Sequence, residues 1–193
     1  RFGLTHEEAM RRCLFMDSRG LVTAARRDRG DFAKQTHKIP CAHHGVAPKR
    51  TLLEAIETLN PTALIGVSTI AGAFDETVLK KMAELNERPV IFPLSNPTHK
   101  AECTFEDAVR FTNGNVAFAS GSPFEPMTHD GSTLYQAQAN NAYVFPSLGH
   151  ATVLADAREI SDNVVLAASE SLAVMTPEQD LRAGTLFPYF AAI

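Results

Sequence analysis

The feature that most constrains the fold of this 193-residue chain is an alternation of short apolar runs with stretches of helical periodicity. The apolar runs are residues 13–16, 62–67, 90–94 and 116–119, and the helical stretches are 52–59, 74–86, 105–111 and 162–175. Buried strands that alternate with helices are typical of a parallel sheet covered on both faces. Because crossovers between parallel strands are right-handed, the pattern predicts a doubly wound, mostly parallel α/β fold. No period holds between 121 and 147, where we expect a long functional loop.

Composition limits the class of protein. With 45% hydrophobic and 21% charged residues, the chain can bury a core, and its length matches one domain of ordinary size. No run approaches the roughly 18 apolar residues of a membrane-spanning helix, and the N-terminus lacks a signal-peptide pattern. Cys13, Cys41 and Cys103 are scattered, which disfavours a disulfide framework and fits a reducing compartment. We therefore expect no membrane segment and a cytoplasmic location, with an organelle as the alternative if a transit peptide precedes Arg1.

A basic segment stands out within a chain whose net charge is -4. Residues 11–50 contain ten Lys and Arg residues against three Asp residues. Such a block is either a solvated face, a local site for phosphate, or the contact surface of a non-catalytic module that binds a polyanion. The absence of interleaved aromatic residues and the acidity of the rest of the chain disfavour nucleic acid as a partner.

Ligands of doubly wound sheets bind beyond the carboxyl ends of the strands, so the residues that follow each apolar run form the candidate site. Residues 17–20 (Asp-Ser-Arg-Gly) follow the first run, and an acidic residue there is typical of a site for the adenosine ribose. Residues 68–73, which are mostly small, follow the second run and would let a ligand approach the backbone. Both have a plain structural alternative, since Asp17 would also cap a turn and small residues would also pack tightly.

Asparagine residues mark two further positions of this kind. Ser95, Asn96 and Pro97 follow the third run, and the proline favours an extended Asn96 whose carboxamide offers two donor hydrogens and an acceptor. Asn140 and Asn141 end the irregular region just before a helical stretch. Capping of that helix explains one of the two, and a ligand role is expected for the pair.

Three long segments resemble successive signature motifs of the malic enzymes, in the order and spacing of that family. They are LSNPTHKAECT at 94–104, FASGSPF at 118–124 and QANNAYVFP at 138–146, with shorter likenesses at 61–66 and 86–89. The similarity runs from about residue 13 to 188. It implies a Rossmann-like cofactor domain and oxidative decarboxylation of L-malate to pyruvate and CO₂, with a nicotinamide cofactor and Mg²⁺ or Mn²⁺. Homodimers or tetramers are the family's usual assemblies.

The resemblance also implies roles for residues of this chain. Asn96, Asn140 and Asn141 match the residues that bind malate. The implied cofactor ligands are Asp17, Ser18, Arg19, Lys38, Val67, Ser68, Ser95, Asn96 and Asn141. Lys38, two residues before Pro40, matches a position at which lysine accompanies NADP and glutamine accompanies NAD, so we expect NADP, with NAD as the alternative.

The resemblance covers only part of the family's pattern. The substrate domain, the metal-binding carboxylates, the catalytic lysine and tyrosine, the first strand and the glycine-rich turn have no counterpart here, so 1–193 is expected to be a partial NAD(P)-binding domain. No catalytic or metal-binding residue is assigned, and Lys100 and Tyr135 do not take those family roles. The chain alone is expected to be inactive, whether it is a fragment or a short protein with another use. Residues 135–138 read Tyr-Gln-Ala-Gln where the family usually has Tyr-Pro-Gly-Gln.

Overall fold

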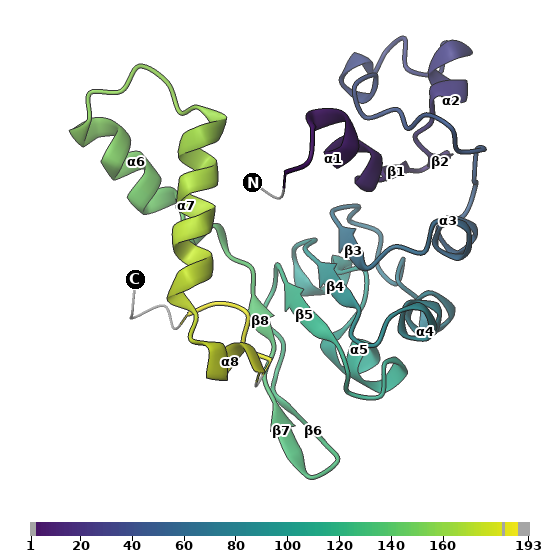
Figure 1. Ribbon diagram of the computed structural model, residues 1–193. Coiled ribbons are helices and arrows are strands. Elements are labelled where there is room, and N and C mark those ends of the chain that lie inside the picture. The colour runs from purple at the N-terminus through teal and green to yellow at the C-terminus, as the bar shows by residue number, and fades with distance from the viewer. Residues whose placement is uncertain (1–2, 183, 189–193) are drawn as a thin grey trace. The chain divides into compact units, whose positions relative to one another are not determined.

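The computed structural model describes residues 3–182 and 184–188 of the chain (Figure 1). Contacts divide the chain into two units, Arg1–Pro61 and Thr62–Ile193, and each is described by itself. The first unit contains α1 (His6–Arg12), β1 (Met16–Asp17), β2 (Gly20–Leu21), α2 (Ala24–Asp28), η1 (Thr36–Lys38) and α3 (Leu52–Leu59). Its small core is built from Val22, Phe32 and Ala42, with Cys41 packed against them.

The prediction that residues 13–16 form a strand of the parallel sheet is wrong. Residues 16–17 instead pair antiparallel with residues 20–21 in a two-stranded ribbon. The chain reverses at Gly20, which has φ +104° and lies so close to Lys49 that a Cβ would sit 2.1 Å from its carbonyl oxygen. The apolar run is therefore cut off by a turn that only glycine accommodates.

The second unit is built on a four-stranded sheet in which every pairing is parallel. Its strands are β3 (Ala63–Gly66), β4 (Val90–Pro93), β5 (Ala117–Ser120) and β8 (Ala137–Gln138), in that spatial order (Figure 1). The first three strands were predicted from their apolar runs, and the expected doubly wound α/β class is confirmed. All four carboxyl ends consequently lie at one edge of the sheet.

Two amphipathic helices bury their apolar faces in this unit, as predicted. They are α4 (Glu76–Leu85), capped by Asp75, and α5 (Phe105–Phe111), capped by Thr104, and they contact each other. The buried faces consist of Val78, Leu79 and Met82 on α4 and Phe105, Ala108 and Val109 on α5. The Phe105 ring lies 5.1 Å from that of Phe118 on β5, which joins the helix layer to the sheet.

The expected long loop at 121–147 is largely ordered structure. It contains the hairpin β6 (Met127–His129) and β7 (Ser132–Leu134), strand β8, η3 (Asn141–Tyr143) and the start of α6 (Phe145–Leu154). Asp130 and Gly131 both have positive φ, 47° and 75°, the backbone conformation of a tight two-residue hairpin turn. The Asp-Gly pair was a hairpin signal within a segment too polar to show a strand period.

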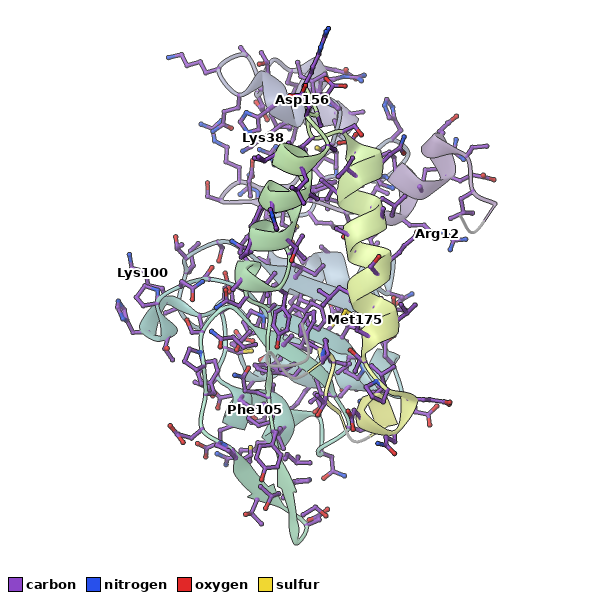
Figure 2. All side chains as sticks on the ribbon, turned by 90° about the vertical axis from the view of Figure 1, so that its left-hand side faces the viewer. Arg12, Lys38, Lys100, Phe105, Asp156 and Met175 are labelled. Carbon is purple, nitrogen blue, oxygen red and sulfur yellow. The ribbon has the colours of Figure 1, made fainter. Side chains whose placement is uncertain are left out.

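Three helices complete the described chain. They are α6, α7 (Asp162–Met175) and α8 (Glu178–Arg182); α7 was predicted at these bounds, and a helical stretch after Asn141 was also expected. Figure 2 shows Asp156 in the loop that joins α6 and α7, and Met175 at the far end of α7. None of the helices within 3–182 and 184–188 has the length and apolar character needed to cross a membrane.

Candidate functional site

Asp17, at the end of β1, is the centre of a charged cluster in the first unit. Lys38 Nζ donates to Oδ2 at 2.6 Å, and Arg26 donates from Nη1 to Oδ1 at 2.9 Å and from Nη2 to Oδ2 at 3.0 Å. The backbone N–H of Arg19 also donates to Oδ1, at 2.8 Å. One carboxylate therefore receives four hydrogen bonds, three of them from cationic groups, and two of its three partner residues, Arg19 and Lys38, were predicted from the sequence.

Arg26 is the partner that sequence reasoning missed. Only 4% of it is exposed, and besides Asp17 its Nη1 donates to the carbonyl oxygens of Gly20 at 2.9 Å and Leu21 at 3.1 Å. Its guanidinium carbon lies 5.1 Å from the centre of the Phe32 ring. Nothing in the local sequence separates Arg26 from the neighbouring Arg27 and Arg29, which are not buried.

The balance of burial and hydrogen bonding keeps Asp17 ionised. Burial raises the pKa of the carboxyl group, but the hydrogen bonds from Arg26 and Lys38 outweigh burial and hold the pKa far below its ordinary value. The carboxylate remains an acceptor at neutral pH, and two cations beside it offset its charge.

Asp17 and Lys38 line a cavity of about 560 Å³ in the first unit. Its other lining residues are Ser18, Arg19, Gly30, Asp31, Ala33, Lys34 and Gln35. All four predicted cofactor ligands of this unit thus share one cavity. A carboxylate can accept hydrogen bonds from sugar hydroxyls, and neighbouring cations can bind a phosphate. The two kinds of group together suit a ribose that carries a phosphate.

Ser68 and Ser95 lie at the carboxyl edge of the sheet, where their hydroxyls are already engaged. Both donate to Oε1 of Glu102, at 2.8 Å and 2.5 Å. Ser68 Oγ also accepts the Ile70 N–H at 3.2 Å. The backbone N–H groups of both serines also donate to Glu102, so neither the hydroxyl nor the N–H of these predicted cofactor ligands is free, whereas Val67, with 76% of its surface exposed, is open to a ligand.

The Asn96 carboxamide is oriented by a buried serine. Ser122 Oγ donates to Asn96 Oδ1 at 2.5 Å, and Asn96 Nδ2 makes a long contact of 3.5 Å to the Leu94 carbonyl oxygen. Gly121 permits this approach, because a Cβ there would lie 2.2 Å from the same carbonyl oxygen. The Asn96 side chain is exposed, so its Nδ2 hydrogens are its free face toward a ligand. The peptide bond from Asn96 to Pro97 is cis.

The structure separates the two asparagines that follow β8. Asn140 Oδ1 accepts the N–H of Ala142 at 2.9 Å, which is the capping role that sequence reasoning kept as the alternative. Asn141 begins η3 and is exposed, and its side chain makes no hydrogen bond to any other residue that the structure describes. Asn141 thus keeps its whole carboxamide for a ligand, whereas the exposed Asn140 keeps its Nδ2 hydrogens.

The unusual Tyr-Gln-Ala-Gln segment is tied to the sheet by its first glutamine. Ser120, at the end of β5, donates from Oγ to Gln136 Oε1 at 2.7 Å. The hydrogen bond attaches the strand leading to Asn140 and Asn141 to its neighbour.

The described residues offer no cluster of metal ligands. Within 3–182 and 184–188 no three His, Cys, Asp or Glu side chains form a group that could hold a metal ion. The described residues thus do not fit the Mg²⁺ or Mn²⁺ that the family resemblance implies. Tyr135 is 64% exposed, and Lys100, on η2 (Thr98–Lys100), is exposed and points away from the sheet (Figure 2).

Comparisons with known proteins bear on the family. The family model described as "Malic enzyme, NAD binding domain" matches residues 1–193. The NADP-dependent malic enzymes of Vitis vinifera and Homo sapiens are each 42% identical to this chain over 187 residues. Those alignments cover 97% and 96% of this chain but 31% and 32% of the relatives. The mitochondrial NAD-dependent malic enzyme of Ascaris suum is 42% identical over 191 residues, which are 99% of this chain and 29% of that protein.

The chain thus spans about a third of the length of these relatives, whose names include both cofactor types. The match covers every motif on which the resemblance rested, together with both places described above. The chain therefore belongs to the malic enzyme family and carries that family's NAD-binding domain.

Proposed function

We propose that this chain provides the NADP-binding part of a protein that converts L-malate and NADP⁺ to pyruvate, CO₂ and NADPH. The observation that carries the proposal is the Asp17–Lys38 ion pair, 2.6 Å long, in a cavity that also holds Ser18 and Arg19. The names of several relatives, which are NADP-dependent malic enzymes, support it.

The choice of NADP follows from the charge arrangement around Asp17. An isolated carboxylate would repel the 2′-phosphate that distinguishes NADP from NAD. Here Arg26 binds both carboxylate oxygens of Asp17 from a buried position, and it also pairs with Asp31 at 3.5 Å, so Asp17 keeps a cationic partner when Lys38 turns away. Lys38, which is 18% exposed, is then free to turn toward the phosphate. When NADP binds, Lys38 thus exchanges the carboxylate of Asp17 for the 2′-phosphate.

The proposed binding of malate rests on the side-chain amides of Asn96 and Asn141. In this proposal the Nδ2 hydrogens of Asn96 and the carboxamide of Asn141, both exposed, hold a carboxylate or hydroxyl of malate at the sheet edge. Amides neither gain nor lose protons at neutral pH, so these residues orient the substrate and the nicotinamide ribose. Since the described residues do not form a metal site, no step of the reaction is assigned to a metal here.

Lys38→Gln in the intact protein tests the cofactor assignment. Loss of one charge-assisted contact to phosphate is worth about 1.5 kcal/mol, so we expect KM for NADP to rise roughly tenfold. KM for NAD should change less than about twofold, because NAD has no 2′-phosphate. Malate-dependent reduction of each cofactor, followed by absorbance, measures both.

Lys80→Gln is the control, because Lys80 is an exposed residue of α4 that pairs with Glu76 and does not line the cavity. It should leave the ratio of the two KM values within about twofold of the original. Equal effects of Lys38→Gln on NADP and NAD would contradict the assignment. A wild-type protein that reduces neither cofactor with malate would contradict the activity itself.

A further inference from the structure

The Glu102 side chain is the most fully buried charge in the described sheet unit. Its exposed fraction is 0%, and its carboxylate receives four hydrogen bonds, all from neutral groups. They come from the N–H and Oγ of Ser68, at 2.7 and 2.8 Å, and the Oγ and N–H of Ser95, at 2.5 and 3.4 Å. Ser68 follows β3 and Ser95 follows β4, so one carboxylate joins two loops.

The backbone around Glu102 reinforces this junction. The carbonyl oxygen of Glu102 accepts the Phe74 N–H at 2.9 Å, and that of Ala101 accepts the Gly72 N–H at 3.4 Å. The loop after β3 is therefore anchored at its start by the Glu102 side chain and at its end by the main chain.

The loop after β3 also contains a strained residue that depends on the same network. Thr69 has φ +57°, a conformation that β-branched residues rarely adopt. Its N–H donates at 2.9 Å to Ser95 Oγ, which in turn donates to Glu102. Removal of the carboxylate would therefore loosen the hydrogen bond that holds this conformation in place.

The negative charge of Glu102 matters to these contacts. Burial raises the pKa of Glu102, but the hydrogen bonds from Ser95 and Ser68 outweigh burial and leave the pKa below its ordinary value. The group is thus ionised at neutral pH. Hydrogen bonds to an ionised acceptor are shorter and stronger than those between neutral groups, and a glutamine amide would offer one acceptor oxygen in place of two.

We propose that Glu102 is a positioning residue, which fixes the two loops against each other so that Asn96 presents its amide to the substrate in one orientation. The proposal rests on the proposed function for the identity of the substrate. Asn96 directly follows Ser95 in the chain, so displacement of Ser95 moves the Asn96 backbone, while Ser122 restrains the far end of its side chain. Glu102 itself, being fully buried, acts through its neighbours.

Glu102→Gln in the intact protein tests this role, with Glu106→Gln as the control. Glu106 lies four residues away on the exposed face of α5, so its substitution removes the same charge without touching the loops. For Glu102→Gln we expect kcat for malate oxidation to fall about tenfold or more, with KM for malate changed less than about threefold, because the ligand contacts persist in poorer geometry. Glu106→Gln should keep the wild-type kcat, and equal kcat values for both variants would overturn the proposal.

Hydrogen exchange gives a second readout that does not require activity. The amides of Ser68 and Thr69, whose acceptors are Glu102 and Ser95, should exchange about tenfold faster or more in Glu102→Gln. The Leu94 amide, which bonds to the Gly66 carbonyl oxygen at 2.8 Å within the sheet, should be unchanged. Unchanged exchange at Ser68 and Thr69, or faster exchange throughout the sheet, would overturn the proposal.

A variant that fails to fold and a wild-type protein that lacks activity lead to different conclusions. If Glu102→Gln does not fold, Ser95→Ala keeps the carboxylate and removes the acceptor of the Thr69 N–H, so that Thr69 should still exchange faster. An unchanged Thr69 amide in that variant would overturn the proposal. If the wild-type protein does not oxidise malate, the proposed function fails, whereas the exchange experiment still decides the role of Glu102.

Discussion

The two units of the chain each hold a buried or half-buried carboxylate, and they offset its charge in opposite ways. Asp17 in the first unit is bound by two cationic side chains and lines a cavity. Glu102 in the second unit is bound by two serine hydroxyls and two backbone N–H groups and has no exposed surface. Charge pairs thus stabilise one carboxylate, and neutral donors stabilise the other.

Each arrangement is suited to a different task. A lysine that pairs with a carboxylate can exchange it for another anion, because a phosphate offers the same kind of contact. The neutral donors around Glu102 have no competing anion to bind. Their hydrogen bonds instead fix the distance between the loop after β3 and the loop after β4. The Asp17 cluster is suited to selecting a ligand, and the Glu102 cluster to holding a geometry.

Removal of Arg26 is the most severe test of this contrast. Arg26→Ala leaves Asp17 and the carbonyl oxygens of Gly20 and Leu21 without their buried donor, so we expect the free energy of unfolding to fall by about 3–5 kcal/mol. Urea unfolding of the intact protein, followed by circular dichroism, measures the loss. Arg27→Ala is the control, since its ion pair with Asp28 is largely solvated and is worth at most about 1 kcal/mol. Equal losses in the two variants would show that the Asp17 cluster does not stabilise its unit.

A methyl group at Gly66 probes how rigid the Glu102 cluster is. A Cβ at Gly66 would lie 2.5 Å from Glu102 Cδ, and the buried side chain has little room to retreat. Gly66→Ala should therefore lower the free energy of unfolding by about 1–3 kcal/mol. At Gly149, within α6, a Cβ would meet no described atom within 4 Å, so Gly149→Ala should raise stability by about 0.5–1 kcal/mol. A neutral result at Gly66 would mean that Glu102 can move, contrary to its proposed role.

The pH dependence of stability gives the smallest effect. Asp17 has a lowered pKa in the folded chain, so its contribution is present above the unfolded pKa of about 4 and is lost as pH falls through the folded value. Lys38→Gln removes one of the groups that lower this pKa, which should reduce stability at pH 7 by about 1 kcal/mol. The loss should shrink as Asp17 becomes protonated. Urea unfolding at a series of pH values tests this, and a loss that is the same at every pH would contradict it.

The parallel sheet could be predicted because its strands are continuous apolar runs, of which β5 is almost wholly buried while β3 and β4 alternate buried and more exposed residues. The runs that became β3, β4 and β5 are apolar and are followed by turn residues, and the capping residue Thr104 marks the helix that lies between β4 and β5 in the sequence. The failures have one physical cause, since both concern backbone turns. The turn at Gly20 shortened one apolar run to a two-residue ribbon, and the turn at Asp130 and Gly131 built a hairpin from residues without a hydrophobic period.

In each unit the candidate ligand residues could be predicted from the sequence, whereas the buried charged residue that supports them could not. Asp17, Lys38 and Asn96 follow strands or match family motifs, so their positions in the sequence made them candidate ligands. Arg26 and Glu102 lie among similar charged residues, and only burial distinguishes them. Which charge a fold buries depends on contacts between distant segments, such as the 34 residues that separate Ser68 from Glu102.

The hydrogen bond from Ser122 to Asn96 has a consequence for molecular discrimination. Because the Ser122 hydroxyl engages Oδ1 and fixes which end of the carboxamide it faces, the Nδ2 hydrogens are the part of the side chain left toward a ligand. A hydroxyl or a carboxylate can supply the lone pair that those hydrogens need, whereas an ammonium group, which has none, would set donor against donor. Under the proposed function, the serine thereby makes Asn96 favour the hydroxyl of a 2-hydroxy acid over the ammonium group of the 2-amino acid with the same carbon skeleton.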